Sequence, residues 1–513
     1  MRVPSEIWQL AAENLSFNRQ VSLIKIRKNL YNKIRAKKFI SPTLVIPKIK
    51  SILELRNLDI GENDKIININ HLQKLRKINI SRGCVIGQKG IEFLQQTEDI
   101  NCDGNNKITN LNNLQKLKKI NISGFSCEVG QIGIESLRQV KEINCTDNNK
   151  ITSLNHLQKL KKVNISYNCR VCQKGIDSLR QVEEINCRYN EKVTSLNHLQ
   201  KLRKVIIPYS CGIDQKGIES LRLVEEIECW GNNKITNLNN LQKLKKISIG
   251  YDCGVDQKGI ESLRLVEEID CRDNGRITNL NHLQKLEKVV IALECGVDQK
   301  GIESLRHVSV IDCFDNRKIT NLNHLQKLKS MNINDSCGVN QKGIESLRRV
   351  ENIYCEDNEK ITDLNHLQKL KIINISGKCG VDQKGIESLR LVEVIYCINN
   401  AKIINLNHLQ NLRIMDISGG CSVDQKGIES LIQVKDINCN DNERIVDLNH
   451  MQNIEILNIC GKCSVSQKGI ESLKRVENIN YWGNDKITDS SLFAKNQERW
   501  CLNRLLNMQK LKK

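Results

Sequence analysis

Apolar residues recur along most of this chain at a spacing of three, and each run ends with a spacing of two. The stretch from Ile277 to Ile291 shows both spacings, with apolar residues at Ile277, Leu280, Leu283, Leu286, Val289 and Ile291. A spacing of two predicts a short strand with one buried face. The spacing of three favours a tightly wound segment, so each run predicts a turn-rich back followed by one strand.

The runs themselves repeat with a fixed period. The tetrad LNHL, or a close variant, marks the period, and its third residue recurs every 42 residues apart from one interval of 43. These positions are His71, Asn113, His156, His198, Asn240, His282, His324, His366, His408 and His450. Each period holds two half-units, and counting their strands from Leu58 to Ile479 gives 21. No half-unit can bury its own apolar edge, so the sequence predicts a solenoid whose neighbouring turns form the core.

The pattern L-x-x-L-x-x-L-x-L resembles the leucine-rich repeat family over nearly all of the chain after residue 50. The half-unit VDQKGIESL is similar to cysteine-containing repeats and predicts a short helix with Asp256 as N-cap. The half-unit DNGRITNLNHL resembles shorter repeats with extended or 3₁₀ backing.

This resemblance implies an α/β fold, a leucine-rich repeat solenoid with a curved parallel β-sheet of about 21 short strands. Short helices and 3₁₀ turns are expected on its convex side, with small helical caps at both ends. We assign residues 58–489 to the solenoid, 41–57 to an extended lead-in segment and 490–513 to a C-terminal capping helix.

Residues 1–40 break the repeat and predict two helical stretches. One interpretation is a cap that shields the first repeat from water. The segment also resembles an F-box, through Val3-Pro4-Ser5-Glu6-Ile7, Leu15, Val21-Ser22-Leu23 and Leu30-Tyr31, although Val3 stands where that family has Leu. F-box domains dock onto the adaptor subunit of cullin–RING ubiquitin ligases, so the resemblance implies adaptor contacts at Pro4, Ile7, Leu15 and Leu23. The repeat style is also similar to leucine-rich repeat and F-box proteins of giant DNA viruses. We keep both interpretations of residues 1–40, a cap and an F-box.

The 22 cysteines form two main series. Nine lie at the second buried position of a strand, and others, such as Cys253 and Cys295, follow the alternate strands. Strand cysteines one period apart are separated by two strands, roughly 9.6 Å, which is beyond disulfide reach. We interpret them as small buried hydrophobic residues, and free buried thiols favour a reducing compartment, the cytoplasm or nucleus.

Metal and cofactor sites are not predicted. The two Cys-x-x-Cys pairs, at Cys169 and Cys460, lie in equivalent turns about 14 strands apart, so they cannot share one metal ion. The repeated histidines occupy a position that asparagine also fills, which indicates a hydrogen bond from the turn and not a metal ligand. Candidate nucleophiles and bases recur in every turn, as scaffold residues do, so no enzyme is predicted.

The net charge of +20 raises nucleic acid as a partner. Most of the excess lies in the repeated QKLKK and DQKG segments, which we place on the back and edge of the solenoid. Aromatic residues make up only 4% of the chain, and no base-stacking motif accompanies the lysines, so a protein partner is favoured over nucleic acid. No stretch approaches 18 apolar residues, so no membrane span is predicted.

The solvent-facing position at the start of each strand forms a lane across the predicted concave face. From Lys77 to Lys288 this lane alternates lysine with Asp or Glu, so neighbouring strands are expected to pair their charges. From Val310 onward the lane becomes apolar, which predicts a protein-interaction patch. Its residues are Val310, Phe314, Tyr354, Ile372, Val394, Tyr396, Ile398 and Ile414, with the two tyrosines on strands two apart. Two alternatives would also explain these apolar residues: drift between duplicated repeats, or burial against a neighbouring copy in an oligomer.

Overall fold

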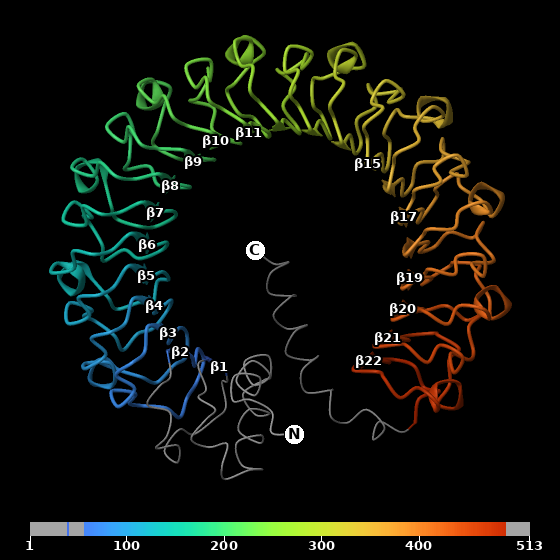
Figure 1. Ribbon diagram of the computed structural model, residues 1–513, viewed down its shortest axis with the longest axis horizontal. Helices are drawn as coiled ribbons and strands as arrows, with labels where there is room; N and C mark the ends of the chain where they lie inside the picture. The colour runs from blue at the N-terminus through green and yellow to red at the C-terminus, as the bar shows by residue number, and fades with distance from the viewer. Residues whose placement is uncertain (1–37, 41–55, 489–513) are drawn as a thin grey trace, which may run out of the picture. The chain divides into compact units, whose positions relative to one another are not determined.

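The structure, a computed structural model, describes residues 38–40 and 56–488. The chain divides into two compact units, unit 1 (Met1–Leu263) and unit 2 (Arg264–Lys513). In each unit the strands line the concave side and the 3₁₀ helices lie on the opposite side (Figure 1). The C-terminal cap, most of the lead-in segment and residues 1–37 lie outside the described residues, so those assignments stay predictions.

Each unit is built on a row of three-residue strands. In unit 1 they are β2 (Asn57–Asp59), β3 (Lys77–Asn79), β4 (Asp99–Asn101), β5 (Lys119–Asn121), β6 (Glu142–Asn144), β7 (Lys162–Asn164), β8 (Glu184–Asn186), β9 (Lys204–Ile206), β10 (Glu226–Glu228) and β11 (Lys246–Ser248). In unit 2 they are β12 (Glu268–Asp270), β13 (Lys288–Val290), β14 (Val310–Asp312), β15 (Ser330–Asn332), β16 (Asn352–Tyr354), β17 (Ile372–Asn374), β18 (Val394–Tyr396), β19 (Ile414–Asp416), β20 (Asp436–Asn438), β21 (Ile456–Asn458) and β22 (Asn478–Asn480). These are the 21 strands that the sequence predicts, and the prediction of the fold is confirmed.

Within each unit, every strand pairs in parallel with the next one along the chain, and equivalent residues lie opposite each other. One further strand, β1 (Lys38–Ile40), pairs with β2 and was not predicted. The middle residue of every strand from β2 to β22 is buried, and its two neighbours are at least partly exposed except for Val290 in β13. In β7, for example, Val163 is buried between Lys162 and Asn164. The period of two therefore decides which side chains can meet a partner.

The spacing of three winds the chain between strands through successive tight turns. The Leu325 N–H donates to the Leu322 carbonyl at 2.9 Å, and the Leu328 N–H donates to the Leu325 carbonyl at 3.0 Å. Each of these i to i+3 bonds closes one turn and directs a leucine into the interior, where all three are buried. The apolar residues three apart and the i to i+3 hydrogen bonds thus belong to the same series of tight turns.

The alternate half-units carry a single turn of 3₁₀ helix. In unit 1 these helices are η2 (Gln88–Gly90), η3 (Gln131–Ile134), η4 (Gln173–Gly175), η5 (Lys216–Ile218) and η6 (Lys258–Ile260). In unit 2 they are η7 (Lys300–Ile302), η8 (Gln341–Gly343), η9 (Lys384–Ile386), η10 (Lys426–Ile428) and η11 (Lys468–Ile470). The N-cap of η6 is Gln257 and not Asp256 as predicted, because the helix begins at Lys258. Asp256 still bonds to this turn, since its Oδ1 accepts the Gly259 N–H at 3.0 Å. All helices within residues 56–488 are of the 3₁₀ type.

A buried asparagine ties successive turns together. The Asn358 side chain donates from Nδ2 to the Ile333 carbonyl at 2.8 Å and to the Val339 carbonyl at 3.3 Å. Its Oδ1 accepts the Lys360 N–H at 3.1 Å. One side chain therefore satisfies three backbone groups in a turn that has no strand partner for them. Equivalent asparagines are Asn105, Asn148, Asn190, Asn232, Asn316, Asn400, Asn442 and Asn484.

Candidate functional site

The charged lane of unit 1 forms the ion pairs that the sequence predicts. Each lysine contacts the acid on the following strand, with N–O distances from 2.6 to 3.6 Å. The pairs are Lys77–Asp99, Lys119–Glu142, Lys162–Glu184 and Lys204–Glu226. The hydrogen bond to the Glu184 carboxylate raises the pKa of Lys162. Because these charges neutralise one another, the lane offers a partner little uncompensated charge.

A shallow hollow of about 320 Å³ lies over the same lane, from β5 to β9. Its walls are the ion-paired side chains together with Asn121, Asn144, Asn164 and Asn186 from the last strand positions. The hollow combines paired charges and amides, which suits hydrogen bonding to a polar surface.

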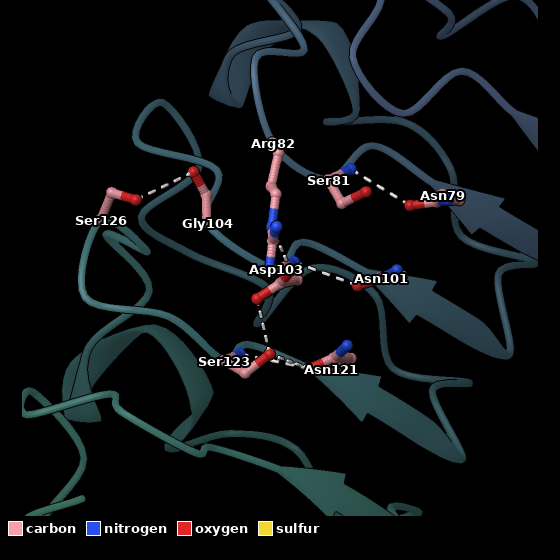
Figure 2. A network of polar contacts seen from close by, with 9 residues as sticks. All are labelled: Asn79, Ser81, Arg82, Asn101, Asp103, Gly104, Asn121, Ser123 and Ser126. Atoms are coloured by element: carbon pink, nitrogen blue, oxygen red, sulfur yellow. Dashed lines mark hydrogen bonds and ion pairs between the residues drawn. The ribbon is translucent and has the colours of Figure 1, made fainter. Parts of the chain in front are cut away.

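The turns that follow the strands of unit 1 form a second exposed edge, and its first part is polar (Figure 2). The Asp103 carboxylate accepts from the Arg82 Nε at 3.0 Å through Oδ2. The Ser123 hydroxyl lies 2.8 Å from Asp103 Oδ1 and 2.6 Å from Asn121 Oδ1. Asn101 closes its own turn by accepting the Asp103 N–H at 3.0 Å. The polar groups drawn in Figure 2 are thus engaged with one another across β3, β4 and β5.

Beyond this polar part, the same edge becomes aromatic. Five side chains in the turns after β7, β8, β9, β10 and β11 contact one another in sequence, and we name them the aromatic ladder: Tyr167, Tyr189, Tyr209, Trp230 and Tyr251. Neighbouring ring centroids are 4.5 to 6.1 Å apart, within the range of direct aromatic contact. Tyr167, Tyr189 and Tyr251 remain 36–39% exposed. The ladder is the largest exposed aromatic group that the described part of unit 1 presents.

An arginine lies at the centre of the aromatic ladder. The guanidinium carbon of Arg188 is 4.7 Å from the Trp230 ring centroid and 5.4 to 5.6 Å from three tyrosine rings. These distances fall within the range of cation–π attraction. The buried Nε of Arg188 has no hydrogen-bond acceptor among the described residues. Aromatic rings surround the guanidinium instead.

The backbone of the ladder is strained. Tyr167, Tyr189, Tyr209 and Tyr251 all have positive φ angles, from 45° to 58°. Most equivalent turns elsewhere place glycine, aspartate or asparagine in this conformation, for example Gly104, Asp357 and Asn399, and the exceptions are Glu62 and Leu293. A bulky residue there costs of order 1–3 kcal/mol, and such strain is typical of functional sites. Gly231 also makes room for the ladder, because a Cβ at this position would lie 2.5 Å from the Tyr209 ring.

The sequence analysis missed the aromatic ladder. A low overall aromatic content obscured the fact that five of the 18 aromatic residues fall in five consecutive half-units. Aligning the half-units on the strand and reading the third residue after it would have revealed the four tyrosines. Neighbouring ring centroids are only 4.5 to 6.1 Å apart, which leaves too little room for a nucleic-acid base to stack between two rings, and nucleic acid stays the less favoured partner.

In unit 2 the structure brings together only part of the predicted patch. Ile372, Val394 and Ile414 lie side by side on β17, β18 and β19. Tyr354 and Tyr396 flank Asn374 on the same face, two strands apart as predicted. Burial, with Tyr354 as a second cause, raises the pKa of Tyr396. We name these five side chains, Ile372, Val394, Ile414, Tyr354 and Tyr396, the unit 2 patch.

The other predicted residues are more dispersed. Val310 lies on β14, and the polar first residues of β15 and β16 separate it from Ile372. Phe314 and Ile398 are in the turns after β14 and β18, on the edge that corresponds to Trp230 in unit 1. Phe314 and Ile398 are half-buried, so they would contribute only at the margin of the unit 2 patch. Pro4, Ile7, Leu15 and Leu23 lie outside the described residues.

The repeated histidines act as the sequence predicts. His324 Nε2 lies 3.0 Å from the Ile302 carbonyl, and His156, His198, His366, His408 and His450 repeat this contact. Asn240 makes the same bond through Nδ2 at 3.1 Å, to the Ile218 carbonyl. Burial lowers the pKa of His324. Across residues 56–488, no group of three or more His, Cys, Asp or Glu side chains is arranged to hold a metal ion. None of the helices in that range is long or apolar enough to cross a membrane.

Comparison with known proteins identifies the architecture. The solved complex of TLR13 with ssRNA13 matches 88% of this chain and 80% of that one, at 14% identity and a TM-score of 0.52. The functional domain of InlJ from Listeria monocytogenes, which includes a cysteine ladder, matches 76% of both chains at 15% identity and a TM-score of 0.35. The internalin InlF from the same organism covers 66% of this chain and 86% of its own, at 16% identity and a TM-score of 0.33. No protein-family profile and no curated protein matches the sequence.

At these identities the similarity is one of fold. The parallel three-residue strands, the i to i+3 turns and the buried asparagines define a leucine-rich repeat solenoid.

Proposed function

We propose that this solenoid is a protein-binding scaffold whose main contact surface is the aromatic ladder with Arg188. The observation that carries the proposal is the strained backbone of four exposed or half-exposed tyrosines, three of which surround Arg188 together with Trp230. Residues that dominate protein interfaces are enriched in Trp, Tyr and Arg, and they form pockets that lose water on binding. A ladder of rings offers large contact area with little side-chain entropy to lose.

The unit 2 patch is the second proposed contact surface. The lane position that carries ion pairs in unit 1 carries Ile372, Val394 and Ile414 in unit 2. An apolar row with two tyrosines beside it suits a partner with an apolar face. Each unit therefore presents one proposed contact surface.

The test compares variants against a partner captured with the wild-type chain and then purified. The double variant Trp230→Ala/Tyr209→Ala should weaken binding by about 2 kcal/mol or more, close to thirty-fold in Kd. The double variant Tyr354→Ala/Tyr396→Ala should have a comparable effect if the partner reaches unit 2. Isothermal titration with each variant measures both losses.

The matched control exchanges the charges of one ion pair, Lys162→Glu with Glu184→Lys, which keeps the pair. Because exposed pairs contribute only about 0–1 kcal/mol, this exchange should leave Kd nearly unchanged. If the exchange weakens binding while both aromatic double variants bind normally, the ion-paired lane is the contact surface and the proposal fails.

A finer proposal couples the solenoid to ubiquitin transfer. We infer from the resemblance of residues 1–40 to an F-box that the chain is the substrate-recognition subunit of a cullin–RING ligase, with the solenoid presenting the target. Pro4, Ile7, Leu15 and Leu23 would carry the adaptor contact. Co-purification with the adaptor should disappear in Ile7→Asp. Absence of adaptor from the wild-type preparation would leave the alternative, in which residues 1–40 cap the solenoid and their deletion lowers stability without loss of a specific partner.

A further inference from the structure

The two cysteine series meet inside the solenoid. Eight of the nine strand cysteines contact the cysteine 24 residues further along, which follows the next strand. Seven such thiol pairs have Sγ–Sγ distances of 3.5 to 3.7 Å: Cys145–Cys169, Cys229–Cys253, Cys271–Cys295, Cys313–Cys337, Cys355–Cys379, Cys397–Cys421 and Cys439–Cys463. An eighth pair, Cys187 and Cys211, is also hydrogen-bonded. All of these cysteines are free thiols.

The sequence-based argument against disulfides compared cysteines within one series only. Members of one series are separated by two strands, but the two series lie in adjacent turns. A disulfide needs its sulfurs at about 2.05 Å, so closing a thiol pair requires a side-chain movement of about 1.5 Å. Nothing in the burial of the cysteines therefore selects a reducing compartment.

The two members of a thiol pair have different surroundings. Lys360 donates from Nζ to the Cys337 carbonyl at 3.2 Å, and Lys318 and Lys402 make the same contact to Cys295 and Cys379 at 3.1 and 3.0 Å. A lysine ammonium is thus held beside the second cysteine of the pair, where it favours the thiolate. The hydrogen bond between the two thiols lowers the pKa of Cys337, and the same bond together with burial raises the pKa of Cys313.

We propose that the thiol pairs are sites of oxidative modification, each closing into an intrachain disulfide when the chain meets hydrogen peroxide. The thiolate of the second cysteine attacks one peroxide oxygen, breaks the O–O bond and becomes a sulfenic acid, while the other oxygen leaves as hydroxide and takes up a proton. The sulfur of the strand cysteine then attacks the sulfenic sulfur and expels hydroxide, which leaves as water with the proton of the strand thiol. Two thiols and one peroxide give one disulfide and two waters, and two electrons pass from the sulfurs to the oxygens.

Each disulfide would join adjacent turns and close a loop between residues 24 apart. Cross-links of this kind restrict the unfolded chain, so the oxidised solenoid should unfold at a higher temperature than the reduced one. The repetition of the thiol pairs along both units makes the effect cumulative.

The experiment uses the full-length, fully reduced protein. After exposure to hydrogen peroxide, free thiols are alkylated and the protein is digested without reductant for mass spectrometry. Disulfides between residues 24 apart are expected, among them Cys313–Cys337 and Cys355–Cys379, together with a higher melting temperature that reductant reverses. The half-buried Cys172 belongs to neither series. It should be oxidised by the peroxide, which makes it an internal control, but it should form none of these disulfides.

Two variants make the result specific. Cys337→Ser should abolish the link from Cys313 while the link between Cys355 and Cys379 still forms, which shows that the protein is folded. Cys172→Ser should lose none of the links. The proposal is overturned if Cys172 becomes oxidised while the paired cysteines remain alkylated as thiols, or if the disulfides join residues at other spacings.

Discussion

In every second turn of the solenoid a buried asparagine amide bonds to the turn before it, and Asn358 illustrates the cost of losing this group. Replacing Asn358 with alanine would leave the Ile333 carbonyl and the Lys360 N–H without their partner in a buried turn. Unsatisfied buried groups cost about 1–3 kcal/mol each. Asn358→Ala should therefore lower the free energy of unfolding by at least that amount in urea titrations. The exposed neighbour Glu359 provides the control. Glu359→Ala should change the free energy of unfolding by less than about 0.5 kcal/mol.

The repeated histidines make stability depend on pH. Burial lowers the pKa of His156, His198, His324, His366 and His408. An unfolded histidine has a pKa of about 6.5, so just below that pH the unfolded chain binds more protons than the folded one. Stability should be complete above about pH 6.5 and fall as the pH drops below it. Urea unfolding at pH 7.5 and 5.5 measures the difference.

A matched variant isolates this effect from other titrating groups. Asparagine already replaces histidine at Asn240 and keeps the hydrogen bond. Changing the five histidines to asparagine should therefore retain the fold at pH 7.5 and reduce the loss of stability at pH 5.5. An equal loss in the variant and the wild type would assign the pH dependence to other residues.

At the scale of the element, the single turn of 3₁₀ helix depends on close backbone packing. A Cβ on Gly343 in η8 would lie 2.3 Å from the Thr320 carbonyl oxygen of the preceding half-unit. The carbonyl of Gly343 accepts the Leu322 N–H at 2.8 Å, so the two segments cannot simply separate. Gly343→Ala should lower the free energy of unfolding by about 1–3 kcal/mol, as overpacking does. Glu345→Ala, at an exposed position of the same segment, should not.

The elements also show what the sequence can and cannot predict. The alternation of apolar and polar residues at the end of each run predicted the positions of β2 to β22, because a strand with one buried face has this sequence pattern. The ion pairs of the lane followed from parallel register alone. The aromatic ladder and the thiol pairs were missed for a common reason. Each arises between residues 20 to 24 positions apart in neighbouring turns, and counting one residue type at one position per period does not bring such neighbours together.

At the scale of the whole molecule, each repeat packs mainly on its neighbours, so stability should add up along the array. Deleting residues 322–363 joins Asn321 to Leu364 and restores the sequence NLNHLQKL at the junction. This variant should fold with the far-ultraviolet spectrum of the wild type and unfold at lower urea concentration.

The control deletion removes half a period. Loss of residues 322–342 would join Gly343 to Asn321, so that two half-units of the same kind follow each other and η8 loses Gln341 and Lys342. This variant should be largely insoluble or unfolded. If both deletions fold equally well, the half-units are interchangeable and the period of 42 has no structural meaning.

The near-identity of the junctions has a consequence for how such a chain changes over generations. Because LNHLQ recurs in register, recombination between two copies of the coding sequence would gain or lose a whole period while every junction stayed intact. The core would tolerate the event, but the side chains on the concave face would acquire new neighbours. Copy number would then act as a means of altering binding specificity without a single point mutation.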